Sequence, residues 1–124
     1  MSKKYSILVI DDEIEILDML SRFLNRNPNF TVQTFSNPVS ALSSLNSTKC
    51  DLVLLDIMMP QMNGLDVLEK LKDMNSDQKV IMMTAYSTLD KVLKSHKIGA
   101  TNYVMKPFSS LDALEKKVVE VLED

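Results

Sequence analysis

A short apolar run that ends in one carboxylate constrains the fold of this chain more than any other stretch. The run is Asp51-Leu-Val-Leu-Leu-Asp56, and a turn built on Pro60 and Gly64 follows it. Apolar residues in sequence between turn signals are typical of a strand buried on both faces, as in parallel sheets. Asp56 is then expected at the carboxyl end of that strand, where open α/β sheets place their ligand sites.

The rest of the chain alternates between strand and helix patterns. We expect strands at residues 5–10, 30–35, 52–55, 79–83 and 102–105, and helices at residues 13–25, 38–45, 64–74, 88–98 and 111–122. Such alternation predicts a parallel sheet with right-handed crossovers and helices on both faces. The expected fold class is α/β, a doubly wound, flavodoxin-like (βα)5 three-layer sandwich with sheet order 2-1-3-4-5. One domain should cover residues 1–124.

Several helix ends carry local signals. Asn37 followed by Pro38 is a cap with proline at the first helical position. Gly99 stands where a left-handed residue ends a helix, and Ser109 or Ser110 caps the last helix. In the first helix, the spacing of the apolar residues predicts a buried face made of Ile14, Leu17, Leu20 and Leu24.

Composition excludes several classes of protein. The net charge of −3 argues against a nucleic-acid surface, and no stretch has the roughly 20 apolar residues of a membrane span. Two glycines cannot supply a Walker-type phosphate loop or a dinucleotide fingerprint, and one histidine excludes His-rich zinc sites. The single Cys50 cannot form an internal disulfide, which favours a reducing cytoplasm.

Polar side chains collect where the predicted strands end. Asp11 and Asp12 follow the first strand, Asp56 the third, Thr84 the fourth and Lys106 the fifth. Carboxylates in one pocket raise each other's pKa, and a hard divalent cation such as Mg²⁺ relieves this repulsion. A carboxylate beside Mg²⁺, a hydroxyl and an ammonium is suited to accept a phosphoryl group, because carboxylates form aspartyl-phosphates.

These residues closely resemble the receiver domain of two-component response regulators. The motifs are Asp11-Asp12, Asp56, Met59-Pro60 with Gly64, Thr84-Ala85 and Lys106-Pro107, and their order and spacing cover essentially the whole chain. The resemblance implies that a histidine kinase or a histidine phosphotransfer protein phosphorylates Asp56. The domain would catalyse only its own phosphorylation and slow dephosphorylation, so it would not be an enzyme with turnover.

The resemblance also implies roles for single residues. Asp12, Asp56 and the backbone carbonyl of Met58 would ligate Mg²⁺, with Asp11 acting through water. Lys106 would pair with the phosphoryl group, and the Lys106–Pro107 peptide bond would be cis. Thr84 and Tyr103 would form the switch, with Tyr103 moving inward as Thr84 engages the phosphoryl group. The face made by the fourth helix, fifth strand and fifth helix would then change its affinity for a downstream protein.

Met58 and Tyr86 would flank the path of water to Asp56 in the family. Neither side chain has a carboxylate or amide that could orient an attacking water, so we predict a slowly hydrolysing phospho-aspartate. Asn63 stands where the family often has Asp, which affects no catalytic position.

Other interpretations remain open at this point. Tyr103 could be an ordinary strand aromatic, and Asp11-Asp12 an acidic first helical turn. A haloacid-dehalogenase-like phosphatase also uses a strand-end Asp, but it needs a second Asp two residues after the nucleophile. A flavodoxin-like cofactor binder needs a Ser/Thr/Gly-rich loop after the first strand, and this chain has none.

Within the receiver interpretation, the chain could be complete or be the N-terminal part of a longer DNA-binding or enzymatic regulator. This domain itself would contact neither nucleic acid nor membrane. It would be a monomer, and dimerisation on phosphorylation stays open.

Overall fold

A five-stranded parallel sheet forms the centre of the molecule. The computed structural model describes residues 3–85 and 90–124. The strands are β1 (Tyr5–Ile10), β2 (Phe30–Phe35), β3 (Leu52–Asp56), β4 (Lys79–Ala85) and β5 (Asn102–Lys106). Their spatial order is β2-β1-β3-β4-β5, and every neighbouring pair is parallel. The predicted fold class and strand order are therefore confirmed.

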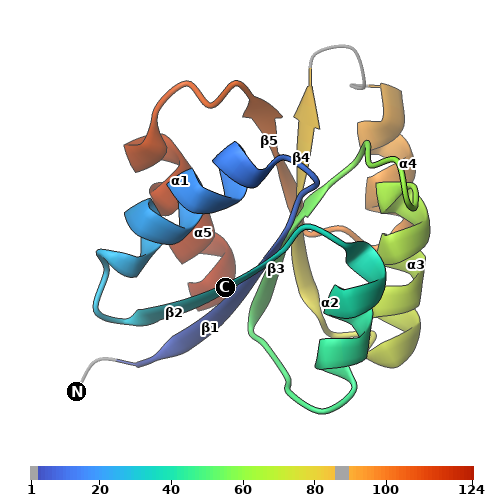
Figure 1. Cartoon of the computed structure of the whole chain (residues 1–124), viewed down its shortest axis with the longest axis horizontal. Coiled ribbons are helices and arrows are strands. Elements are labelled where there is room, and N and C mark those ends of the chain that lie inside the picture. The colour runs from blue at the N-terminus through green and yellow to red at the C-terminus, as the bar shows by residue number, and fades with distance from the viewer. Residues whose placement is uncertain (1–2, 86–89) are drawn as a thin grey trace.

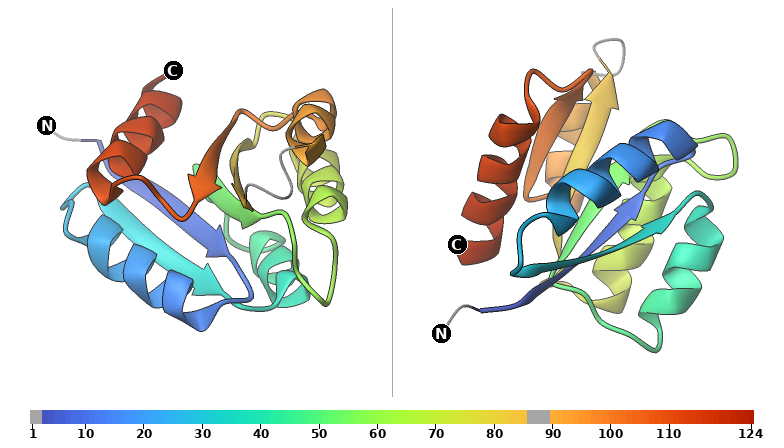
Figure 2. Two further views of the ribbon diagram at one scale, coloured as in Figure 1. Left: turned by 90° about the horizontal axis from the view of Figure 1, so that it is seen from above. Right: turned by 60° about the vertical axis from the view of Figure 1, so that its left-hand side comes forward.

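Helices cover both faces of this sheet. They are α1 (Ile14–Asn25), α2 (Pro38–Leu45), α3 (Gly64–Met74), α4 (Asp90–Ile98) and α5 (Leu111–Glu123). α1 and α5 lie on one face, and α2, α3 and α4 lie on the other (Figure 1, Figure 2). None of these helices has the length and apolar character that crossing a membrane requires.

The sheet separates two apolar cores. One core packs β-strand side chains against α1 and α5, and the other packs them against α2 and α3. Alternate residues of each strand point to opposite faces, so neighbouring residues such as Leu54 and Leu55 belong to different cores. β3 lies between β1 and β4, and all five of its residues are buried, as expected for a strand covered on both faces.

Three strands extend further toward their carboxyl ends than the sequence predicts. β3 includes Asp56, β4 includes Thr84 and Ala85, and β5 includes Lys106. These residues stay in the sheet because their backbones continue the pairing with the neighbouring strands. Asp56 pairs with Met83, and Ala85 pairs with Lys106. Backbone pairing with a neighbouring strand therefore outweighs the low strand preference of Asp. Residues 88 and 89 of the predicted fourth helix lie outside the described ranges.

The capping signals match the structure at three helix ends. The side chain of Asn37 accepts a hydrogen bond from the Val39 amide (2.8 Å), and Ser110 accepts one from the Ala113 amide (2.9 Å). Gly99 has φ = 125°, the left-handed region expected after α4.

The prediction for Ile14 was wrong, because its side chain is 60% exposed. Ile14 is the first residue of α1, and at this end of the helix its side chain faces solvent. The other three residues of the predicted face are buried.

Candidate functional site: an acidic pocket at the carboxyl edge of the sheet

Strand register brings the predicted site residues to one level of the sheet. Ile10 pairs with Leu55, so Asp11 is expected beside Asp56 in the next layer. Lys106 pairs with Ala85 at the end of β5. Because parallel strands end on the same edge, side chains far apart in sequence meet there.

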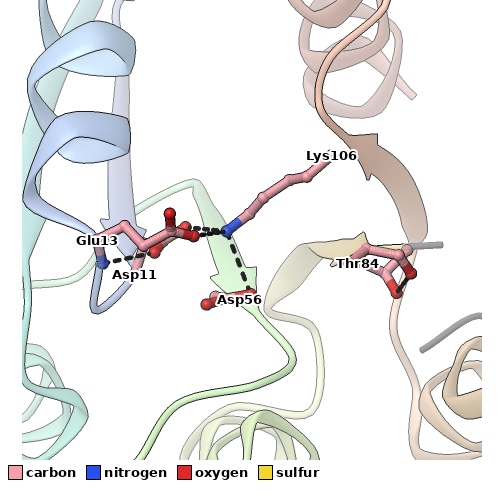
Figure 3. A network of polar contacts seen from close by, with 6 residues as sticks. Asp11, Glu13, Asp56, Thr84 and Lys106 are labelled. Atoms are coloured by element: carbon pink, nitrogen blue, oxygen red, sulfur yellow. Dashed lines mark hydrogen bonds and ion pairs between the residues drawn. The ribbon is translucent and has the colours of Figure 1, made fainter. Parts of the chain in front are cut away.

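Strand alternation places the side chains of Asp11, Asp56 and Lys106 on one face. By residue parity, all three share the face that packs against α1 and α5. Figure 3 shows the lysine ammonium extending toward both aspartates. β4 lies between β3 and β5 in the sheet. The long Lys106 side chain therefore extends past β4 to reach the aspartates (Figure 3).

The Lys106 ammonium contacts three carboxylates. Its Nζ lies 2.8 Å from Asp11 Oδ2, 3.0 Å from Glu13 Oε1 and 3.5 Å from Asp56 Oδ1. Burial alone would lower the pKa of Lys106, but these carboxylates outweigh it and raise that pKa to about 12. Lys106 is therefore a permanent cation in the pocket.

Asp11 is fully buried beneath this cation. Its Oδ1 accepts a hydrogen bond from the backbone amide of Glu13 at 2.8 Å. Its Oδ2 contacts Lys106 Nζ as an ion pair, without the geometry of a hydrogen bond. Burial raises the pKa of Asp11 above its ordinary value, although Lys106 and the Glu13 amide act in the opposite direction. Asp11 Oδ2 is therefore buried in an ion pair and still able to accept a hydrogen bond or bind a cation.

The surroundings of Asp56 disfavour its ionised form. Burial raises its pKa first, and the negative charge of Asp11 adds to the effect. Lys106 lowers the pKa, whereas the hydrogen bond and the charge of Asp12 raise it, and the result is about 7. Without a further cation, this carboxyl group is thus only partly ionised near neutral pH.

The three aspartates fit a metal ion. Asp11, Asp12 and Asp56 each offer one oxygen, and these oxygens lie within 4.8 Å of one another. Such an all-oxygen, anionic set is the type that hard divalent cations occupy. Burial and the neighbouring carboxylates raise the pKa of Asp56 although Lys106 is present, so a further cation at this site would stabilise the ionised form.

The two residues predicted to flank the water path can be placed only in part. Met58, in the loop after β3, has a side chain that is 54% exposed. Tyr86 lies outside the described residues. The Lys106–Pro107 peptide bond is cis.

Thr84 does not share the direction of Asp56 and Lys106. Its parity in β4 matches Met82, which belongs to the core beneath α2 and α3. Thr84 is fully buried, and its hydroxyl donates to the carbonyl of Ala85 at 3.1 Å. Figure 3 shows it to one side of the Lys106–Asp56 contact. Thr84 thus lies at the carboxyl end of β4, as the sequence predicts, and its role as a switch residue stays a prediction.

Tyr103 lies outward on the edge strand. The residue is 38% exposed, and its ring faces the ammonium of Lys117 on α5 at 5.3 Å from the ring centroid. Register pairs Tyr103 with Met82 and Met105 with Thr84. Tyr103 and Thr84 therefore point to the same face of the sheet, which a coupled movement of the two residues requires.

Sequence reasoning missed one member of the site. Glu13, the first residue of the first predicted helix, was not assigned to the site, yet its carboxylate contacts Lys106 Nζ at 3.0 Å. The signal that could have identified it is the third consecutive carboxylate in Asp11-Asp12-Glu13.

Residues 7–119 of the chain match the protein-family model described as "Response regulator receiver domain". The chain belongs to the response regulator receiver family. Receiver domains work with histidine kinases or phosphotransfer proteins and can be fused to output domains.

Several curated and solved receiver proteins are similar to this receiver domain. Sporulation initiation phosphotransferase F of Bacillus subtilis is 34% identical over 94% of this chain and 92% of its own length. Regulatory protein VanR of Enterococcus faecium is 34% identical over 89% of this chain but only 47% of its own length. Among solved structures, the receiver domain of NtrX from Brucella abortus superposes with a TM-score of 0.88 at 28% identity, covering 94% of this chain and 98% of that one.

The lengths of these relatives differ from that of the receiver chain. This chain spans nearly all of the length of the Bacillus protein, about half of the length of VanR and 26% of the length of the regulator NtrC of Proteus hauseri. Family membership therefore identifies this chain as a receiver domain. The further functions of the longer relatives are said only of those proteins.

Proposed function

We propose that Asp56 accepts a phosphoryl group from a histidine kinase or a histidine phosphotransfer protein. A carboxylate oxygen of Asp56 would form a new bond to phosphorus as the bond between phosphorus and the donor atom breaks. The donor leaves with the electron pair of the broken bond, and the product is an acyl phosphate on the aspartate. No oxidant or reductant takes part.

The surrounding side chains support this role by charge and position. Lys106, which already contacts Asp56 at 3.5 Å, would neutralise one phosphoryl oxygen. Asp11, Asp12, Asp56 and the Met58 carbonyl would hold Mg²⁺. When bound, Mg²⁺ supplies positive charge that offsets the charge of the carboxylates and the phosphoryl group. Burial of Asp56 between strands fixes the acceptor for in-line attack.

The phosphoryl group would act as a signal and not as an intermediate of turnover. Thr84 would engage it and Tyr103 would move inward, which changes the face formed by α4, β5 and α5. A downstream protein or a fused output domain would bind that face. We propose no direct contact of this domain with nucleic acid or membrane, and a monomeric resting state in the cytoplasm, with dimerisation reserved for the phosphorylated form.

One observation carries the proposal: the ammonium of Lys106 bridges Asp11 and Asp56 inside a cluster of three aspartates. Incubation with acetyl phosphate and Mg²⁺ tests it. Intact-mass spectrometry should show the addition of one phosphoryl group, and peptide analysis should place it on Asp56. Chelation of the metal should prevent the addition.

Two variants sharpen this experiment. Asp56→Asn should abolish labelling, while Asp73→Asn, which changes an exposed carboxylate on α3, should leave it intact. Absence of labelling in the unmodified protein, or labelling that persists in Asp56→Asn, would overturn the proposal.

A further inference from the structure

The Lys106 ammonium is engaged more closely by Glu13 than by the acceptor aspartate. Its Nζ lies 3.0 Å from Glu13 Oε1 and 3.5 Å from Asp56 Oδ1. Figure 3 shows Glu13 and Asp11 together on one side of the ammonium and Asp56 on the other. An ammonium has three hydrogen-bond donors, and three carboxylates already surround it, so a further acceptor such as a phosphoryl oxygen must draw it from one of them.

The backbone of Glu13 is held in place although its side chain is 59% exposed. Its amide donates to Asp11 Oδ1 at 2.8 Å, and its carbonyl accepts from the amides of Ile16 and Leu17 at 3.1 and 3.2 Å. Glu13 is also the N-cap residue of α1, and its side chain makes no capping hydrogen bond. The Glu13 carboxylate is therefore available to contact Lys106, and the backbone that carries it is held in place.

We propose that Glu13 is a positioning residue that draws the Lys106 ammonium toward its own side of the pocket and competes with the phosphoryl group for it. This inference rests on the proposed function of Asp56 and Lys106. A phosphoryl group on Asp56 would have to draw Lys106 from its present partners. Asp11 has a second proposed role as a metal ligand, whereas Glu13 has none, so Glu13 is the partner that remains in competition.

Neutralising Glu13 should therefore ease the engagement of Lys106 by a phosphoryl group. The effect should be modest, about two- to fivefold, because ion pairs with one exposed partner are screened by water. Glu13→Gln keeps the length and polarity of the side chain and removes only its charge. The start of α1 should persist, since the Glu13 side chain does not cap it.

Beryllofluoride with Mg²⁺, a stable mimic of a phosphoryl group, provides the binding probe. We expect its dissociation constant, measured by titration calorimetry, to fall about two- to fivefold in Glu13→Gln. Glu15→Gln is the matched control, because it removes an exposed carboxylate from the same helix outside the pocket. It should bind the probe like the unmodified protein.

A double-mutant comparison separates positioning from general electrostatics. In a Lys106→Gln background, Glu13→Gln should no longer change the affinity for beryllofluoride, because the residue through which Glu13 acts is gone. An equal gain with and without Lys106, or no gain in Glu13→Gln, would overturn the inference.

A second readout needs neither phosphorylation nor metal. The ¹⁵N–¹H signal of the Lys106 side-chain ammonium should be observable in the unmodified protein and should shift or broaden in Glu13→Gln, but not in Glu15→Gln. If acetyl phosphate fails to label the unmodified protein, the proposed function fails. If labelling succeeds but the ammonium signal is independent of Glu13, only the present inference fails.

Discussion

Lys117 of α5 holds Tyr103 of β5 through both the backbone and the ring. Its Nζ donates to the Tyr103 carbonyl at 2.8 Å and lies 5.3 Å from the centroid of the aromatic ring. A cation over an aromatic face is attracted by the ring quadrupole. The pair therefore stabilises the outward position of Tyr103 in the structure.

Replacing Lys117 with methionine should loosen this position. Methionine keeps the apolar stem of the side chain but removes the charge and the donor, which corresponds to about 0.5–1 kcal/mol at an exposed site. We expect the minor inward population of Tyr103, measured by NMR relaxation dispersion on the ring, to rise about two- to fivefold. Lys116→Met, at the exposed neighbouring lysine, is the control and should not change it. An unchanged population in Lys117→Met would show that the contact has no effect on the switch.

The raised pKa of Asp56 predicts a pH-dependent stability. Because the folded pKa is about 7 and the ordinary value is 3.8, the folded state retains a proton that the unfolded chain releases in this interval. The free energy of unfolding contributed by Asp56 therefore falls as pH rises from about 4 to 7. Without metal at pH 8, Asp56→Asn should be more stable than the unmodified protein by roughly 4 kcal/mol.

Urea denaturation at several pH values, in a metal chelator, measures this difference. It should shrink toward zero near pH 4, and Mg²⁺ should remove it at pH 8 by stabilising the ionised carboxylates. Asp73→Asn serves as the control for loss of an exposed charge. A constant difference across the whole range would contradict the assignment to Asp56.

The exposed Met58 predicts a long-lived phospho-aspartate. Its thioether cannot orient water as an amide or carboxylate does, so the phosphoryl group should persist well beyond seconds in Mg²⁺ buffer. Met58→Asn should shorten the lifetime by at least about tenfold, as positioned polar groups do in related chemistry. The lifetime of the phospho-aspartate is measured from the release of inorganic phosphate over time. Met74→Asn, at the exposed end of α3, should leave the lifetime unchanged, and decay within seconds in the unmodified protein would refute the prediction.

The two glycines should respond differently to alanine. A Cβ on Gly64 would lie 2.6 Å from the Ile57 Cα and would also collide with the Asp56 carbonyl oxygen, so backbone would have to move. At Gly99 the nearest atom is the flexible end of Lys72, and the main cost is the left-handed φ of 125°. Urea denaturation should show losses of about 3 kcal/mol for Gly64→Ala and about 1 kcal/mol for Gly99→Ala.

Gly64→Ala should also slow labelling of Asp56 by acetyl phosphate, because the displaced backbone carries the acceptor. Gly99→Ala should label normally. Equal destabilisation of the two variants would show that the loop after β3 adapts more easily than its close contacts suggest.

Much of the fold was predictable because its signals are local. The apolar runs that end at Ile10 and Asp56 mark buried strands, and parallel pairing then brings Asp11, Asp56 and Lys106 to one edge. Short-range chemistry also fixed the caps, as at Ser110. These features depend on the residue itself and its near neighbours in sequence.

The contacts that sequence reasoning missed join distant residues through long side chains. Glu13 and Lys106 are 93 positions apart, and only the twist and register of the sheet bring them together. The same holds for Lys79 at the start of β4, whose ammonium binds the carbonyls of Val121 and Asp124 at the end of α5. Periodicity gives the face on which a residue lies, but it does not give the reach of a flexible side chain.

The burial of all of β3 has a consequence for how any partner must approach. Asp56 is carried by the innermost strand, clamped by ladders on both sides, and cannot swing out to meet a donor. Under the proposed function, the donor protein must bring its phosphoryl group to Asp56, because the backbone of Asp56 does not move toward the donor. The accuracy with which a donor protein docks, to a fraction of an ångström, should then decide which donors phosphorylate Asp56. Slow motion of the receiver domain should not.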